Sequence, residues 1–163
     1  MTSSRRLELR IALMTLLAGS LLLQAFLPAL AEAVGGGYAE TERLVVPYAL
    51  TGVAAVACLQ VCLAAGWWLL GRERRGVLVE PRSLRGVDAA TAGLVAATVL
   101  AVGPMVHLLA VVGVGGPGVV LALVACVVGG AGLTRVLRSL RADLRAAVDR
   151  AGVDEAARTD AVV

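Results

Sequence analysis

The sequence predicts an all-α integral membrane protein in which four helices cross the bilayer as a bundle. Hydrophobic residues make up 59% of the 163 residues and charged residues only 17%. The mean hydropathy is +0.86. The charges are also segregated, because no Asp, Glu, Lys or Arg occurs in residues 11–31, 44–71 or 89–134. Helices of soluble proteins carry a polar face, which these stretches lack, so we expect them to lie in lipid.

The first two charge-free stretches predict the first two spans. Residues 11–30 would form a helix about 30 Å long, which just crosses the hydrocarbon core. The second span, residues 44–70, is longer and is expected to tilt. Pro47 lies in its first turn, where a missing amide is tolerated, and Trp67 and Trp68 at its other end are typical of a membrane interface.

The third charge-free stretch is too long for one helix, and the glycine-rich residues 113–118 indicate a turn in its middle. We therefore expect a helical hairpin, with a third span over residues 89–112 and a fourth over 119–134. Asp88 is placed to cap the third span, and Pro104 should kink it. Apolar residues continue at helical spacing after the fourth span, which predicts an amphipathic cytoplasmic helix over residues 135–152.

The remaining segments complete a single membrane domain over residues 11–152. Residues 1–10 are interpreted as a cytoplasmic amino terminus, and residues 153–163 as a frayed tail. A cleaved signal peptide is the alternative for residues 1–31, because Ala29 and Ala31 fit the small-residue cleavage pattern. The apolar run exceeds the usual signal length, which favours an uncleaved span.

The distribution of arginine predicts the orientation. Fourteen of the fifteen arginines lie before the first span, between the second and third, or after the fourth, and only Arg43 lies on the opposite side. Positive residues stay in the cytoplasm, so both termini are expected inside. All basic residues are arginine, Lys and Asn are absent, and Ala, Val, Leu and Gly dominate, which suggests a bacterial cytoplasmic (inner) membrane protein.

Small residues at every fourth position predict close packing between helices. These stripes are Ala54, Cys58, Cys62 and Gly66 in the second span, Ala89, Gly93, Ala97 and Ala101 in the third, and Ala122, Cys126 and Gly130 in the fourth. The three cysteines lie inside apolar runs without the further ligands that a metal ion needs. We therefore expect no metal site, no cofactor and no catalytic residue.

Three polar side chains inside the spans are candidate intramembrane contacts: Gln24, Gln60 and His107. Exposing such groups to lipid is costly, so they should bond neighbouring helices or line a path through the membrane. Gln24 lies about 9 Å and His107 about 7.5 Å below the outer ends of their spans. We therefore expect these two to meet, and Gln60 to lie near mid-membrane, level with Ser20 and Thr98.

Arginines of the loop and tail are candidate contacts for anionic lipid headgroups or for a cytosolic, regulatory partner protein. They are Arg72, Arg74, Arg75, Arg82 and Arg85 in the loop and Arg138, Arg141 and Arg145 in the tail. Direct binding to nucleic acid is not expected, because the arginines flank apolar spans without an exposed aromatic surface beside them.

Short motifs along residues 10–150 support a family resemblance. They are AGSLLLQ at 18–24, VPY at 46–48, CLQV at 58–61, RRG at 74–76, RGVD at 85–88 and VHL at 106–108. With these motifs the chain resembles an uncharacterised family of four-span bacterial membrane proteins, domain-of-unknown-function family 2975. The resemblance implies no established activity. Some members are encoded beside a helix-turn-helix regulator, which implies a regulatory setting, and their loop aromatics are replaced here by Val79, Leu84 and Gly86.

Two functional hypotheses follow. The first is a non-enzymatic membrane protein whose basic loop and tail contact anionic lipid or a cytosolic partner. The alternative is a small oligomeric transporter or pore lined by His107, Gln24 and Gln60, although the spans lack carboxylates and an evident inverted repeat. An enzyme is disfavoured, since no nucleophile and base or set of metal ligands is evident. The sequence leaves a homo-oligomer open.

Overall fold

The computed structural model describes residues 3–35, 42–75, 80–113 and 116–160. They form α1 (Ser3–Gly35), α2 (Glu42–Arg74), α3 (Pro81–His107), a π-helix η1 (Leu108–Val112) and α4 (Pro117–Asp160). Four stretches are long and apolar enough to cross a membrane: Leu7–Ala33, Leu44–Glu73, Pro81–Val112 and Pro117–Val153. The prediction of an all-α chain with four membrane-spanning helices is therefore confirmed in its number of spans and their order.

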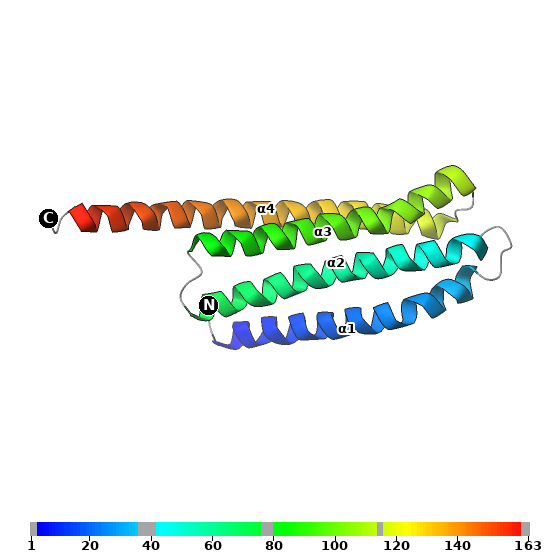
Figure 1. The fold of residues 1–163 in the computed structure, drawn as a ribbon, viewed down its shortest axis with the longest axis horizontal. Coiled ribbons are helices and arrows are strands. Elements are labelled where there is room, and N and C mark those ends of the chain that lie inside the picture. The colour runs from blue at the N-terminus through cyan, green and yellow to red at the C-terminus, as the bar shows by residue number, and fades with distance from the viewer. Residues whose placement is uncertain (1–2, 36–41, 76–79, 114–115, 161–163) are drawn as a thin grey trace.

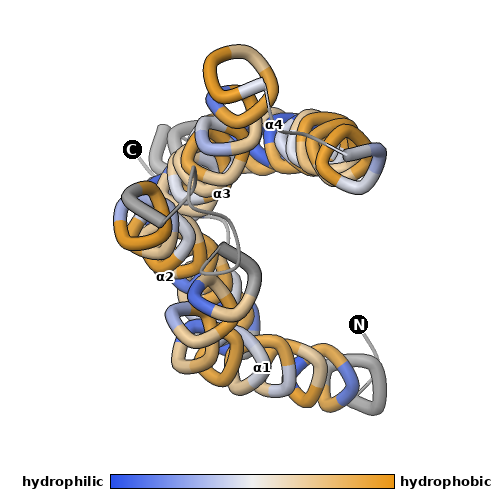
Figure 2. The backbone as a smooth tube through the Cα atoms, turned by 90° about the vertical axis from the view of Figure 1, so that its right-hand side faces the viewer, coloured by the Kyte–Doolittle hydropathy of each residue, from blue (hydrophilic) through white to orange (hydrophobic). Residues whose placement is uncertain are grey.

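The helices pack only on their neighbours in the sequence. Within the described residues α1 contacts α2, α2 contacts α3, and α3 contacts α4. Figure 2 shows them end-on as an open arc, with α1 and α4 at its two ends. The bundle is thus open rather than closed, and large apolar side chains such as Phe26 (66% exposed) and Leu121 (70% exposed) face outward. In lipid this exposure carries no hydrophobic cost.

One end of the bundle collects the start of α1, the end of α2 and the start of α3 (Figure 1). We call it the arginine end, because Arg10, Arg72, Arg82 and Arg85 belong to these helix ends. α4 runs past this end as one helix from Pro117 to Asp160. Residues 153–160, expected to fray, are helical as well, and residues 161–163 lie outside the described part.

Small residues bring the helices close at two of the predicted stripes. A Cβ atom on Gly93 would lie 2.8 Å from the carbonyl oxygen of Cys58, and one on Gly130 would lie 2.5 Å from Oγ1 of Thr98. α3 therefore approaches α2 and α4 at distances that only glycine permits. Gly66 differs from its stripe, because a Cβ there would lie 3.8 Å from Leu13 of α1.

The start of α3 corrects one sequence-based prediction. Asp88 is not the cap of this helix, which begins at Pro81 with Glu80 as its N-cap residue. Proline suits the first helical position because its fixed φ is helical and its missing amide would be unpaired there. The helix therefore starts two turns earlier than the charge-free stretch. At its other end, Pro104 lies inside α3, and the π-helix η1 follows directly after His107.

Candidate functional site

Arg72 ties the end of α2 to the start of α3. Its Nε donates a hydrogen bond to Oγ of Ser83 at 2.9 Å, and its guanidinium also forms an ion pair with Glu80. The guanidinium lies 5.0 Å from the centre of the Trp68 ring, a cation–π contact. Ser83 is fully buried, and only 14% of the Arg72 side chain is exposed. Arg72, a candidate contact for lipid or for a partner protein, is thus already bonded within the chain.

Arg141 joins α4 to α3 through a bidentate ion pair. Nε and Nη2 of Arg141 donate to the two carboxylate oxygens of Asp88 at 2.5 and 3.3 Å. The hydrogen bond from the guanidinium to Asp88, and then the charge of that carboxylate, raise the pKa of Arg141 above its usual range. This pair takes the place of the helix cap expected for Asp88, and it fixes the level of α4 against α3.

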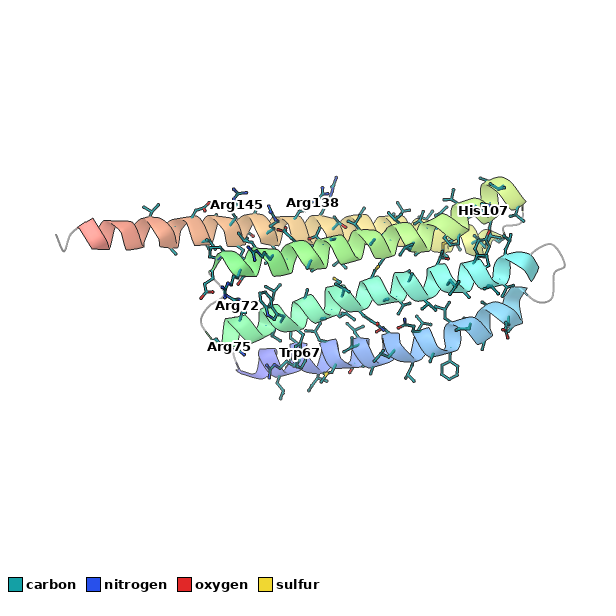
Figure 3. The ribbon with its side chains drawn as sticks, viewed as in Figure 1. Trp67, Arg72, Arg75, His107, Arg138 and Arg145 are labelled. Carbon is teal, nitrogen blue, oxygen red and sulfur yellow. The ribbon has the colours of Figure 1, made fainter. Side chains whose placement is uncertain are left out.

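Most of the remaining candidate arginines have no bonded partner among the described residues. Arg75, Arg82, Arg85, Arg138 and Arg145 are exposed, and the described residues offer none of them a hydrogen bond or ion pair. Figure 3 shows Arg138 and Arg145 projecting from α4 on the side away from α2. The side chain of Arg74 lies outside the described side chains. Free charge is therefore concentrated around the start of α3 and along α4.

The two tryptophans near the end of α2 each meet an arginine. The centre of the Trp67 ring lies 5.3 Å from the guanidinium carbon of Arg10 on α1, and the Trp68 ring contacts the guanidinium of Arg72. The sequence placed these tryptophans at the interface but did not reveal their cation–π partners. The available signal was that arginines and tryptophans occur at the same end of adjacent spans.

Gln60 bridges α2 to α1 between two of the stretches that are apolar enough to cross a membrane. Its Nε2 donates to Oε1 of Gln24 at 2.9 Å and to Oγ of Ser20 at 3.4 Å. The predicted level of Gln60 with Ser20 is confirmed, whereas the predicted meeting of Gln24 with His107 is wrong. That prediction rested on the equal depth of two polar groups that each need a partner, whereas α1 does not contact α3 in the described residues.

His107 pairs with Tyr48 of α2. The Tyr48 hydroxyl and Nδ1 of His107 are hydrogen-bonded at 2.5 Å, and their rings meet edge to face with centroids 6.0 Å apart. The phenolic hydroxyl can donate to Nδ1 when the imidazole carries its proton on Nε2. Both residues line a pocket of about 280 Å³ between α2 and α3. Tyr48 was not among the candidates, although it is one of only two tyrosines in the chain.

The titratable side chains do not gather into a metal centre. Across the described ranges, no three His, Cys, Asp or Glu side chains lie close enough together to hold a metal ion. Cys58, Cys62 and Cys126 are free, half-buried thiols. The backbone of Cys58 and Cys62 lies against Gly93, so α2 and α3 approach one another at this pair of residues.

The comparisons with known proteins give one match. Neither the curated proteins nor the solved structures yield a similar protein. A family model described as "Protein of unknown function (DUF2975)" matches residues 29–156. The match covers the end of α1 and most of the chain from α2 to α4, and it leaves the motif at residues 18–24 outside. Since well over half of the chain is matched, the protein belongs to the DUF2975 family of unknown function.

Proposed function

We propose that this chain is a non-enzymatic protein of the bacterial cytoplasmic membrane that presents the end of α4 to a cytosolic partner protein. The observation that carries the proposal is the length of α4, which continues as one helix to Asp160 beyond the other three helices (Figure 1). The concentration of arginine at this end of the bundle supports a cytoplasmic location for the tail, because positive residues stay in the cytoplasm.

The ion pair between Arg141 and Asp88 allows the projection to be calculated. From that common level α3 extends seven residues to Pro81, or about 10 Å, and α4 extends nineteen residues to Asp160, or about 28 Å. α4 therefore passes the start of α3 by about 18 Å. This distance is more than twice the Debye length of about 8 Å at physiological ionic strength. Headgroup charge is largely screened at that range, which favours a protein partner over lipid.

The charge of the projecting segment supports the same choice. Residues 149–160 carry four acidic side chains, Asp149, Asp154, Glu155 and Asp160, and two basic ones, Arg150 and Arg158, so their net charge is −2. A negative segment is repelled by anionic lipid. Arg138 and Arg145, which have no bonded partner among the described residues, lie closer to the membrane on the same helix, where they can contact lipid headgroups.

The alternative of a pore lined by His107, Gln24 and Gln60 is less well supported. The two glutamines satisfy one another between α1 and α2, whereas His107 bonds Tyr48 between α2 and α3. A shared path would need these groups to face one cavity, and they belong to two separate helix interfaces.

Site-specific photocrosslinking in cells tests the proposal. A photoreactive amino acid at Ala151 should give a discrete adduct with a cytosolic protein, and one at Leu121, within the fourth span, should not. Ser139→Pro should abolish the adduct, because proline breaks a helix at a cost of about 3 kcal/mol. Adducts with lipid alone, no protein adduct, or an adduct unchanged by Ser139→Pro would contradict a helical docking segment.

A further inference from the structure

A groove follows the contact between α3 and α4 and ends among arginines. Its volume is about 410 Å³, within the range of ligand-binding pockets. The apolar lining includes Val95, Val99 and Val102 of α3 and Val127 and Ala131 of α4. Arg135 and Arg138 line its other end. The groove therefore combines an apolar length with a cationic end.

The two arginines lie deeper than the other charges of this interface. Arg141 is level with Asp88, and α3 carries no charge from Ala89 onward. Because α3 and α4 are antiparallel, Arg138 and Arg135 lie about 4.5 and 9 Å further toward the membrane than Arg141. The backbone positions of both arginines are thus level with the apolar part of α3. A charge at this depth is costly unless it reaches the interface or meets an anion.

The described part of the chain supplies no such anion to Arg135 or Arg138. Arg72 and Arg141 are matched by Glu80 and Asp88. Arg135 and Arg138 have neither a hydrogen bond nor an ion pair with any described residue, and both are exposed. The cationic end of the groove is therefore complementary to a negative group from outside the chain.

The groove also has the length of one membrane leaflet. From Val127 to Arg138 the helix rises eleven residues, or about 16 Å. Half of a hydrocarbon core of about 30 Å is about 15 Å. A ligand with its anionic group at the arginines would place an apolar chain along the valines and end near mid-membrane.

From these observations we propose that the groove binds one anionic phospholipid of the surrounding leaflet. An acyl chain lies along the valines, and the phosphate accepts hydrogen bonds from Arg135 and Arg138. Arginine suits this role because its planar guanidinium can donate two parallel hydrogen bonds to a phosphate. The site is independent of the proposed partner of the tail, since it lies on the membrane side of Arg141.

Native mass spectrometry of the full-length protein in detergent tests the site. The probes are dioleoylphosphatidylglycerol, dioleoylphosphatidylcholine with the same acyl chains, and soluble glycerol phosphate. One molecule of phosphatidylglycerol should bind in preference to the other two probes. The double variant Arg135→Gln/Arg138→Gln should bind it about 25-fold more weakly, at about fivefold for each arginine.

Matched variants separate the groove from general surface charge. Arg145→Gln/Arg150→Gln removes the same charge from the same helix outside the groove and should bind almost normally. Ala131→Phe should block the apolar part, whereas Ala125→Phe, on the opposite side of α4, should not. Circular dichroism confirms that each variant retains its helical content.

Several results would overturn the proposal. Equal binding of phosphatidylcholine would remove the role of the phosphate charge, and equal binding of glycerol phosphate would remove the acyl chain. Equal losses in the two arginine double variants would indicate unspecific attraction. Normal binding by Ala131→Phe would show that the lipid does not occupy the groove.

Discussion

Replacing Gly130 by alanine should weaken the packing of α4 on α3, whereas the same change at its neighbour Gly129 should not. A Cβ atom at Gly130 would lie 2.5 Å from Oγ1, 2.6 Å from Cγ2 and 3.1 Å from Cβ of Thr98. At Gly129 a Cβ atom would meet nothing within 4 Å. The two positions therefore differ in packing but share a helix and a membrane depth.

Thr98 cannot easily move out of the way. Its β-branched side chain is stiff at χ1, and Oγ1 donates to the carbonyl oxygen of Leu94 at 2.8 Å. Overpacking of this kind costs about 1–3 kcal/mol. Alanine favours a helix over glycine by about 1 kcal/mol at either position. The difference between the two variants cancels this propensity, so Gly130→Ala should be about 1–3 kcal/mol less stable than Gly129→Ala.

Reversible unfolding in mixed detergent micelles, driven by dodecyl sulfate and followed by circular dichroism, measures this difference. It corresponds to about 5- to 150-fold in the unfolding equilibrium constant. Thr98→Ala should rescue Gly130→Ala, because it removes both γ atoms from the clash, and it should not improve Gly129→Ala. Equal stability of the two glycine variants, or no rescue, would refute the close approach of α3 and α4 at this point.

Three further predictions follow from the contacts. In a double-mutant cycle, Gln24→Leu and Gln60→Leu should couple by about 0.6 kcal/mol and at most about 1.7 kcal/mol. Gln24→Leu and His107→Leu should instead be additive, and the reverse pattern would contradict the α1–α2 pairing. Ser83→Ala removes the acceptor of Arg72 and should destabilise by about 1–3 kcal/mol in the same unfolding assay, while the exposed Ser139→Ala should stay within about 0.5 kcal/mol; equal effects would mean that the Arg72 bond contributes little. In a cysteine-free background, a reporter cysteine at Gly116 should be labelled from outside intact cells and one at Ser139 protected, and the opposite labelling would invert the proposed orientation.

The sequence could predict the number of spans, because transfer into lipid depends on composition along a short stretch of chain. Helical periodicity also persists after Thr134, and α4 is one helix through this point to Asp160. The helix starts were harder to place. α3 begins at Pro81 rather than at Asp88 because a helix does not end where its lipid-facing part ends, and the charge-free stretch marks only the latter.

Among the candidate sites, the shared level of Gln60 and Ser20 could be read from the sequence, but the partners of Gln24 and His107 could not. Helical rise placed Gln60 level with Ser20, and their contact confirms this level. The same rise suggested that Gln24 meets His107, yet Gln24 bonds Gln60 and His107 bonds Tyr48. Two groups at equal depth meet only if their helices are neighbours, and the open arc separates α1 from α3.

The sequence by itself thus determined which segments are long and apolar enough to cross a membrane, that Gln60 is level with Ser20, and toward which end the arginines gather. Only the tertiary structure decided which helices are neighbours, that Glu80 and Ser83 engage Arg72, and that Asp88 holds Arg141. The physical reason is that a helix apolar on every side has no polar face to mark its orientation. Its rotation and its neighbours are set by close packing at residues such as Gly93 and Gly130, and this packing depends on both partners at once.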